Sequence, residues 1–484
     1  IALAPPELIK VFEQYENRGK LYFRATVKGK SINGNTPAIR ADFGCKDAFF
    51  YNEETHNKVD GIRFKGHFTN GAKRSAETME FAIADFSAKP ETGKFSGFIR
   101  VNNFVSPTIH MQLVSDFNLD FLAKFVNSAE LRGLKGGVKL TMNFRDIIDL
   151  NHPERSIRKL NESYYCKLEV KNLRFDSEKI PYTIKDIDLL AEVKGHAATL
   201  NYCTIRVGNT DLKMDGSVSD LPAIVHHTDL PVTTHLNIHS RLLDLHELTK
   251  TEKEQAAMVD EQLEDLRLKL SFVTTARNLT ESPTLPVGEF YIDDLYAKLK
   301  HYPHKLHDFH ADVLIRENDF NVVDFTGEID NSDFHFSGGL HNYNMWFDEK
   351  LNGDTRIDFD LTSKQLKLED LFVYKGENFV PKDYRHEELD QLKLHGNAKL
   401  HFNHGLKSTD LQLDRFGAKM KLHHSRIEHL KGRIHLEDDH LMVQHLDAKI
   451  GRSSMLVDLN YYLGDNEAIR KHDNLLKIKS SRLD

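Results

Sequence analysis

The sequence predicts a mainly β protein: an elongated, curled antiparallel β-sheet made of repeated units with short helices. Three observations predict this class. Apolar and polar residues alternate through many short stretches, which is the pattern of strands with one apolar side. The same series of stretches recurs at intervals of about 120 residues, and such self-similarity is typical of repeat architectures. Polar residues that suit turns separate one stretch from the next.

Composition and charge narrow the classes of protein that fit. The chain has 484 residues, of which 40% are hydrophobic and 29% are charged, and its formal net charge is -8. This balance is typical of a globular or repeat protein, not of a disordered chain. A negative net charge without a cluster of Lys and Arg argues against a nucleic-acid partner. Cys45, Cys166 and Cys203 are too widely spaced for a disulfide framework or a zinc site.

The clearest element of the repeat is an alternating strand around a small residue. It occurs four times, as Phe95, Gly97 and Ile99; Leu212, Met214, Gly216 and Val218; Phe334, Phe336, Gly338 and Leu340; and Met455, Val457, Leu459 and Tyr461. Another alternating stretch precedes each copy, with apolar members that include Met79, Phe81 and Ile83; Leu200 and Ile205; Phe320, Val322 and Phe325; and Leu441, Val443 and Leu446. The period of two predicts strands that are half-buried.

A further strand follows each copy and leads into an acidic, leucine-rich segment. These segments are Leu119–Leu122, Leu243–Leu245 and Leu368–Leu371. We predict that each is a short helix or loop that starts at a serine, because a serine ahead of acidic residues can cap a helix; the serines are Ser115, Ser240 and Ser363. The fourth copy stops at residues 481–484, so we expect the chain to be a fragment of a longer protein.

The repeats divide the chain into four predicted domains. Residues 1–125 hold an N-terminal helix and the first repeat, and residues 126–250 hold the second repeat. Residues 251–372 hold a charged insert and the third repeat, and residues 373–484 hold a truncated fourth repeat. The opening helix is predicted over Pro5–Phe12, where prolines open the segment and apolar residues share one face. A short surface helix is predicted over Thr249–Asp265, followed by a turn-rich link over Asn278–Pro286.

These units carry a resemblance to a known family. The residues that carry it are Gly97–Phe104 with Pro107 and the Leu119–Leu122 segment, then Val207–Leu212 running to Gly216, and Ser240–Leu245. They resemble the AsmA-like family of envelope proteins, which includes relatives of TamB. The resemblance covers nearly the whole chain, and none of the residues in these motifs is catalytic.

The resemblance implies a fold, a compartment and a role. AsmA-like proteins are tethered to the inner membrane by an N-terminal helix, and they extend through the periplasm as a curled β-sheet, or β-taco, with an apolar channel. The implied function is non-enzymatic: phospholipid transport between the inner and outer membranes, which supports outer-membrane biogenesis and integrity. The implied partners are a phospholipid or other acyl-chain lipid, the inner membrane through a helix absent from this chain, and a possible outer-membrane partner.

The apolar residues of the repeated strands form the predicted lipid groove. A sheet with one apolar side must cover that side with a second layer, close on itself, or present it to a ligand. The predicted groove residues are Phe95, Ile99, Leu200, Leu212, Met214, Val218, Phe320, Val322, Phe334, Phe336, Leu340, Leu441, Val443, Met455 and Val457. Periodicity alone fits the core of a β-sandwich equally well, and the family resemblance favours the groove.

The polar residues predict no catalytic, cofactor or metal site. Four histidines at every third position would alternate faces on a strand, and Pro303 disfavours a helix there; they are His301, His304, His307 and His310. The pairs Asp293–Asp294 and Asp438–Asp439 are predicted to be solvated turn charges. We therefore expect no enzyme activity, no cofactor and no metal. The alternative functions are a scaffold for outer-membrane protein assembly through exposed strand edges, and an extracellular glycan-binding module.

Overall fold

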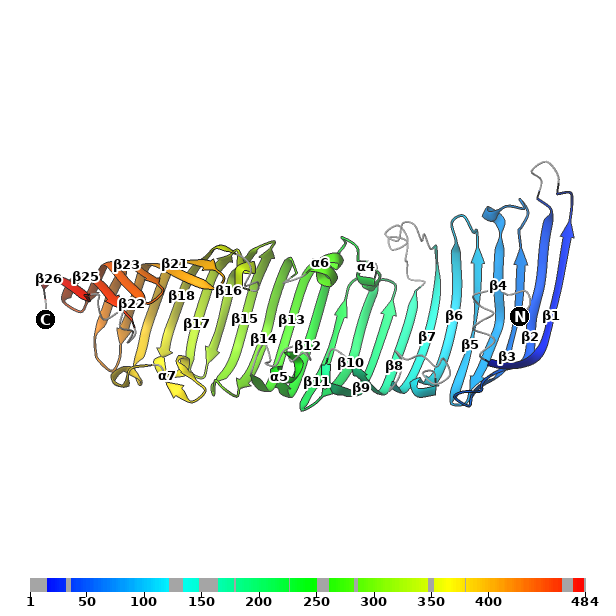
Figure 1. Ribbon diagram of the computed structural model, residues 1–484, viewed down its shortest axis with the longest axis horizontal. Helices are drawn as coiled ribbons and strands as arrows, with labels where there is room; N and C mark the ends of the chain where they lie inside the picture. Colours follow the sequence, from blue (N-terminus) through cyan, green and yellow to red (C-terminus); the bar gives the residue numbers. More distant parts are fainter. Residues whose placement is uncertain are drawn as a thin grey trace. The chain divides into compact units, whose positions relative to one another are not determined.

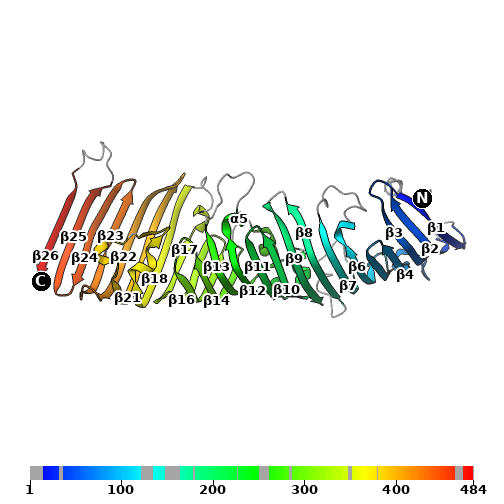
Figure 2. The ribbon, with the colours of Figure 1, turned by 90° about the horizontal axis from the view of Figure 1, so that it is seen from below.

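One antiparallel sheet of 24 strands makes up most of the computed structural model, as Figures 1 and 2 show. The structure describes residues 15–31, 36–121, 134–147, 164–177, 180–225, 227–249, 261–282, 286–346, 352–378, 380–463 and 473–482. The predicted mainly β class and the antiparallel pairing are confirmed. The chain divides into two compact units: unit 1 is Ile1–Thr234 with Asp244–Asp260, and unit 2 is His235–Leu243 with Glu261–Asp484.

In unit 1 each strand pairs with the next one along the chain, because short turns join antiparallel neighbours. The strands are β1 (Tyr15–Lys28), β2 (Ala38–Asn52), β3 (Asn57–Thr69), β4 (Glu80–Pro90), β5 (Gly93–Asn102), β6 (Thr108–Asn118), β7 (Lys135–Ile147), β8 (Tyr165–Ser177), β9 (Ile180–Lys194), β10 (Ala197–Val207) and β11 (Thr210–Val218). Strand β12 (Pro231–Asp244) contributes residues to both units.

Unit 2 continues the same pattern with one interruption. Its strands are β13 (Gln262–Thr275), β14 (Gly288–Leu299), β15 (Lys305–Arg316), β16 (Asp319–Ile329), β17 (Ser332–His341), β18 (Asn352–Lys367), β21 (Glu388–Asn403), β22 (Leu406–Met420), β23 (Arg426–Glu437), β24 (His440–Ile450), β25 (Ser453–Tyr462) and β26 (Leu475–Arg482). Strand β18 pairs directly with β21. The intervening β19 (Val373–Tyr374) and β20 (Glu377–Asn378) form a separate two-stranded ribbon.

The repeated strand predicted from the sequence falls on every sixth strand of the main sheet. Its four copies lie in β5, β11, β17 and β25 when the ribbon strands β19 and β20 are left out. The preceding stretches lie in β4, β10, β16 and β24. The repeat is therefore a group of six strands. The three domain boundaries at residues 125, 250 and 372 stay a prediction.

The helices are short and lie between strands. They are η1 (Ala76–Thr78), α4 (Leu221–Val225), α5 (Leu245–Thr249), α6 (Ala276–Glu281), η3 (Tyr343–Trp346), α7 (Leu368–Leu371) and η4 (Lys382–Tyr384). The leucine-rich segment Leu368–Leu371 forms helix α7, as predicted, whereas Leu243 and Asp244 of the earlier segment end strand β12 and only Leu245 belongs to helix α5. None of the helices in the described ranges has the length and hydropathy that crossing a bilayer requires.

Several local predictions were wrong. The three serines do not begin helices: Ser115, Ser240 and Ser363 lie inside β6, β12 and β18 and are buried there. The predicted link after Asn278 begins as helix α6, where Thr275 caps the first turn by accepting a hydrogen bond from the Asn278 backbone N–H at 3.2 Å. Of the helix predicted over Thr249–Asp265, residues 250–260 lie outside the described residues, and its end, with Leu263 and Asp265, lies in strand β13. The predicted helix Pro5–Phe12 lies outside the described residues.

Bulges interrupt many strands at the same kind of residue. Asp85, Asp186 and Asp308 lie within strands at a shift of register, and their φ angles are 53°, 54° and 54°. Aspartate tolerates this left-handed conformation better than most residues. Gly136, with φ 131°, lies at a bulge in β7, and Gly338 lies beside the shift of register between β16 and β17. A bulge bends its strand and increases the local twist.

Candidate functional site

The register of unit 2 places its apolar residues on one face of the sheet. Directly opposed residues in antiparallel strands share a face. Phe336 in β17 is opposite Phe325 in β16 and Leu361 in β18. This row continues, one strand at a time, through Leu394, Phe416, Leu430, Ala448 and Met455. A second row crosses the same face through Ile315, Phe320, Leu340, Ile357, Ala398, Leu411, Ile434, Val443 and Leu459.

Unit 1 has the same arrangement. Ile99 in β5 is opposite Ile83 in β4 and Met111 in β6. Three further rows share a face with it: Gly97, Leu113, Met142, Cys166, Val193, Ala198 and Val218; Phe95, Ser115, Leu140, Leu168, Ala191 and Leu200; and Phe117, Val138, Val170, Leu189, Cys203 and Met214. We call this side the apolar face of each unit. The predicted groove residues of each unit therefore lie together on it.

Most side chains of the apolar face are neither buried nor fully exposed, although some, such as Ile315, Val170 and Cys203, are buried. All fifteen predicted groove residues fall in this intermediate range of exposure. Residues of these types in the core of a sandwich are usually almost completely buried. Neighbouring strands cover these side chains from the sides, and their tips stay accessible. The exposure pattern therefore fits a single layer better than the sandwich that periodicity left open.

Aromatic rings on this face lie across glycines of the neighbouring strand. A Cβ atom added at Gly66 would be 2.2 Å from the Phe43 ring, and one added at Gly327 would be 2.8 Å from the Phe309 ring. The glycines let the rings lie down along the sheet, an arrangement that protects glycine in strands. Phe309 also contacts Phe325 and Phe334, with ring centroids 5.5 and 5.4 Å away. The phenylalanines thus pack sideways and do not need a second layer to hold them.

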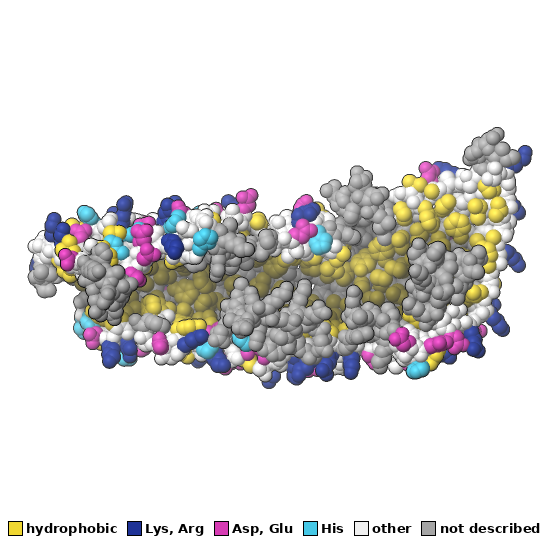
Figure 3. Space-filling model, in the orientation of Figure 1, with side chains coloured by type: hydrophobic (Ala, Val, Ile, Leu, Met, Phe, Trp, Pro, Cys, Tyr) yellow, Lys and Arg dark blue, Asp and Glu magenta, His cyan; other side chains and the backbone are white. Residues whose placement is uncertain are grey.

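In the described ranges no second sheet lies over the apolar faces, since the only other sheet is the ribbon of β19 and β20. The ribbon is held beside the β14–β15 turn, where the Lys375 backbone N–H donates to the His301 carbonyl at 2.7 Å. Figure 3 shows apolar side chains gathered over β3 to β8 in unit 1 and over β13 to β18 in unit 2. Charged side chains lie along the outline of both regions. This separation is what binding of an apolar ligand requires.

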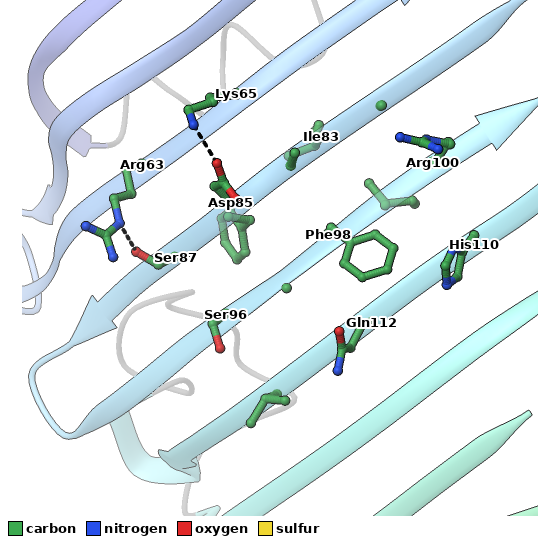
Figure 4. Close-up of a pocket in the computed structure, with 16 residues that line it drawn as sticks. Arg63, Lys65, Ile83, Asp85, Ser87, Ser96, Phe98, Arg100, His110 and Gln112 are labelled. Carbon is green, nitrogen blue, oxygen red and sulfur yellow. Dashed lines mark hydrogen bonds and ion pairs between the residues drawn. The ribbon is translucent and has the colours of Figure 1, made fainter.

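The opposite side of the sheet, which we call the polar face, has a depression in unit 1. It has a volume of about 920 Å³ and is drawn in Figure 4. Its floor is low because β4 contributes small residues there, among them Ala82, Ala84 and Ser87. Its walls are Arg63, Lys65, Asp85, Phe98, Arg100 and His110. The Phe98 and His110 rings meet edge to face with centroids 4.8 Å apart.

Three of the four Arg, Lys and Asp residues that line this depression take part in ion pairs, one of them with Glu80 outside it. Lys65 contacts Asp85 at 2.7 Å, and this hydrogen bond raises the pKa of Lys65 and lowers the pKa of Asp85. Arg63 donates through Nε to Ser87 Oγ at 2.9 Å. Arg100 lies 3.5 Å from Glu80. Since paired, solvent-exposed charges attract an ionic ligand only weakly, the apolar face is the better candidate site.

The four regularly spaced histidines do not converge. His304 Nδ1 contacts Asp330 at 2.7 Å, while His301 meets the ring of Tyr374 edge to face. His307 contacts Asp308 at 2.6 Å, and this hydrogen bond raises the pKa of His307. His307, Asp308 and Glu328 form one group whose ligand atoms lie within 4.8 Å of one another. Sequence spacing could not indicate this group, because Glu328 reaches it from the neighbouring strand β16.

The two aspartate pairs differ in position. Asp438 and Asp439 lie in the turn between β23 and β24, as predicted. The prediction for Asp293 and Asp294 was wrong, because both lie within β14. Asp294 lies opposite a lysine, Lys269, of the neighbouring strand β13. An opposed lysine is the ordinary cross-strand partner of a surface carboxylate.

Sequence reasoning missed a set of buried carboxylates at the ends of strands. Glu387 is 0% exposed and accepts hydrogen bonds from the backbone N–H groups of Leu422, His423 and Glu388. Glu247 is 5% exposed and accepts from the backbone N–H groups of Asn209 and Thr210. Each carboxylate accepts hydrogen bonds from backbone N–H groups of a turn that have no partner in a neighbouring strand. These groups close turns, and their role is structural.

Comparison with known proteins does not assign the chain. The sequence matches no protein-family model, and it matches no curated protein.

Proposed function

We propose that the apolar face of the sheet binds the acyl chains of lipids and that the protein carries phospholipid between the inner and outer membranes of a cell envelope. One observation carries the proposal: rows of partly exposed apolar side chains cross one face of a single-layered sheet in each unit. Acyl chains would take the position of the second layer. The role is one of binding and transfer, without catalysis.

The energetics support this ligand. Burial of apolar surface contributes about 0.8 kcal/mol per methylene, so one acyl tail could contribute on the order of 10 kcal/mol before ordering costs. Such binding needs no charged partner, and the headgroup would lie at the wetter rim of the face. The repeated bulges support a curled sheet, because each bends its strand, and a curled sheet would enclose a tail on more than one side.

The resemblance to the AsmA-like family supports the envelope setting of the proposal. On this proposal the full-length protein lies in the periplasm and is anchored in the inner membrane. Its contribution to outer-membrane integrity follows from the supply of phospholipid. The chain itself would form part of the path that tails follow.

Mass spectrometry of lipids extracted from the purified chain tests the proposal directly. We expect phospholipid to co-purify with the chain, because the apolar face would otherwise stay in contact with water. An extract without lipid, obtained from folded protein after incubation with phospholipid vesicles, would contradict the proposal. The measurement does not depend on knowing the transported species.

A matched pair of substitutions on β5 separates the apolar face from general surface effects. Phe95 shares the apolar face with Ser115, whereas Phe98 lies on the polar face opposite Gln112, and both rings are partly exposed. We expect Phe95→Asp to reduce retained lipid at least severalfold, because it places a charge against the acyl chain. Phe98→Asp should leave lipid retention unchanged. Circular dichroism of both variants controls for folding, and Phe336→Asp extends the test to unit 2.

A further inference from the structure

Strand β1 has a free edge. In the described part of the chain β1 pairs on one side alone, with β2. Figures 1 and 2 both show it as the outermost strand of unit 1. Along such an edge the outward N–H and C=O groups have no ladder partner, and they form a template for another strand. The strand spans Tyr15–Lys28, which is long for an unprotected edge.

The apolar side of β1 is much more exposed than the rest of the apolar face. Leu21, Phe23 and Val27 are 76%, 69% and 63% exposed, although they are opposite Cys45, Phe43 and Ile39 of β2. Phe43, one strand further in, is only partly exposed. The difference arises because β1 has a neighbour on one side instead of two. A strand added at this edge would cover these three side chains.

The polar side of β1 is basic. Lys20, Arg24 and Lys28 share it, and none of them takes part in the ion pairs identified among the described residues. Elsewhere in the sheet, several basic residues on the polar face pair with acidic residues of the neighbouring strand, and others pair with acidic residues of their own strand, such as Lys171 with Glu169. Examples of pairs between strands are Lys65 with Asp85 at 2.7 Å, Lys298 with Asp265 at 3.1 Å and Lys399 with Asp354 at 2.8 Å. The strand that fits β1 by the same rule is acidic at the corresponding positions.

A second copy of this chain does not fit the edge. In the described part of the chain β26 also pairs on one side alone, with β25, and it carries Lys477 and Lys479, so it would bring like charges to β1. Two β1 strands side by side would do the same. Like charges opposed across strands are destabilising, and lysines on edges keep copies of a protein apart.

We propose that the free edge of β1 binds a β-strand of a partner protein, and that this strand alternates apolar with acidic residues. The added strand pairs antiparallel with β1 through the backbone. Its apolar residues cover Leu21, Phe23 and Val27, and its acidic residues, four positions apart, face Lys20, Arg24 and Lys28. Main-chain pairing gives such complexes their affinity, and the side chains give them their specificity. This site is independent of the proposed lipid-binding function.

The test uses the whole chain and two synthetic peptides of about ten residues, the length of an ordinary strand. Both peptides alternate apolar and polar residues, and they carry either Glu or Lys at every fourth position. We expect the Glu peptide to bind at least tenfold more tightly than the Lys peptide in fluorescence anisotropy at low salt. In hydrogen exchange, bound Glu peptide should slow the exchange of β1 amides.

A charge-reversed chain, Lys20→Glu with Arg24→Glu and Lys28→Glu, makes the test independent of folding. We expect it to prefer the Lys peptide, because its acidic side chains would then face lysines. An unfolded variant could lose binding but could not exchange its preference. Equal binding of both peptides, or no binding, would overturn the proposal. Self-association of the chain through β1 would also overturn it. So would a chain that binds anionic vesicles but neither peptide and that loses vesicle binding on charge reversal, because the basic side would then bind a membrane surface.

Discussion

The two faces of the sheet arise from the same strands, yet different interactions hold them. On the apolar face, rings and aliphatic chains pack sideways, as Phe309 does against Phe325 and Phe334. On the polar face, residues meet in exposed ion pairs such as Lys65 with Asp85. Apolar burial contributes roughly 25 cal/mol per Å², whereas an exposed ion pair contributes less than about 1 kcal/mol. Stability should therefore depend mainly on the apolar face, which is also the face that we propose as the lipid-binding site.

The polar face itself differs between the units. In unit 1, most of its ion pairs within the described ranges use lysine or arginine, as Lys171 with Glu169 and Lys194 with Glu192 do. In unit 2, histidine supplies many of the pairs, including His335 with Asp324, His401 with Asp354 and His435 with Asp410. Histidine changes charge near neutral pH, and lysine does not. Unit 1 has fewer such pairs, among them His67 with Asp42 and His196 with Asp220, so the polar face of unit 2 should respond to pH more strongly than that of unit 1.

The largest effect is expected on the apolar face. Phe309 is 6% exposed, and Phe309→Ala removes a ring that lies across Gly327 and contacts two other phenylalanines. We expect the free energy of unfolding to fall by about 3–5 kcal/mol. Urea titration followed by circular dichroism measures the change.

A control on the same unit sharpens this prediction. Val323 is 60% exposed in β16, so Val323→Ala should change the free energy of unfolding by less than about 0.5 kcal/mol. If Phe309→Ala were no more damaging than this control, sideways packing would not hold the apolar face. The contrast drawn between the faces would then fail.

A smaller but substantial effect is expected at a buried turn carboxylate. Glu387→Ala leaves the backbone N–H groups of Leu422, His423 and Glu388 without their acceptor. We expect a loss of about 3 kcal/mol in the free energy of unfolding, because buried donors without partners are costly. Glu388 is the matched neighbour: its ion pair with Lys421 lies at the surface, so Glu388→Ala should cost less than about 1 kcal/mol.

Acid should reproduce the effect of the Glu387 substitution. Burial would raise the pKa of Glu387, but hydrogen bonds from His423 and from three backbone N–H groups outweigh burial and lower it. A carboxyl with a lowered pKa stabilises the fold above its ordinary value of about 4.3, and this contribution is lost as pH falls through the lowered value. In Glu387→Gln the acid-dependent loss between about pH 5 and pH 3 should be smaller than in the unsubstituted chain. An identical pH profile would show that another group controls it.

The sequence could predict the two faces of the sheet and could also have indicated some of its bulges. Alternation over Phe334, Phe336 and Leu340 identifies a strand and its apolar side, because the period of two is local. A bulge can also be recognised in the sequence. The apolar residues Val322 and Phe325 are three positions apart, not two, and the register shifts between them. An alternating pattern that skips one extra residue therefore predicts a bulge, and this signal was available in the sequence.

The burial of polar side chains could not be predicted from the sequence pattern. Ser363 resembles a helix cap in sequence, yet it lies buried in β18 beside Asp333 of β17, with Oγ 3.4 Å from the carboxylate. In the sequence Glu387 looks like an ordinary surface charge. It is buried because the β22–β23 turn, more than thirty residues further along the chain, lies over it. Both outcomes depend on partners distant in the chain. Pattern reasoning on neighbouring residues does not contain that information.

The smallest effect is expected at a histidine pair on the polar face of unit 2. The hydrogen bond to Asp410 raises the pKa of His435. A histidine with a raised pKa stabilises the fold fully below its ordinary value of about 6.5, and the contribution is lost as pH rises through the raised value. His435→Gln should therefore lower the free energy of unfolding at pH 5.5, by less than about 1 kcal/mol, and have a smaller effect at pH 8.

Lys65 in unit 1 provides the control that decides whether histidine is the cause. Its hydrogen bond to Asp85 raises the pKa of Lys65 and lowers that of Asp85, so both groups stay charged between pH 5.5 and pH 8. Lys65→Gln should consequently have the same effect at both pH values. If His435→Gln were equally indifferent to pH, the histidine pairs of unit 2 would be no more than neutral hydrogen bonds. The polar faces of the two units would then be electrostatically alike near neutral pH.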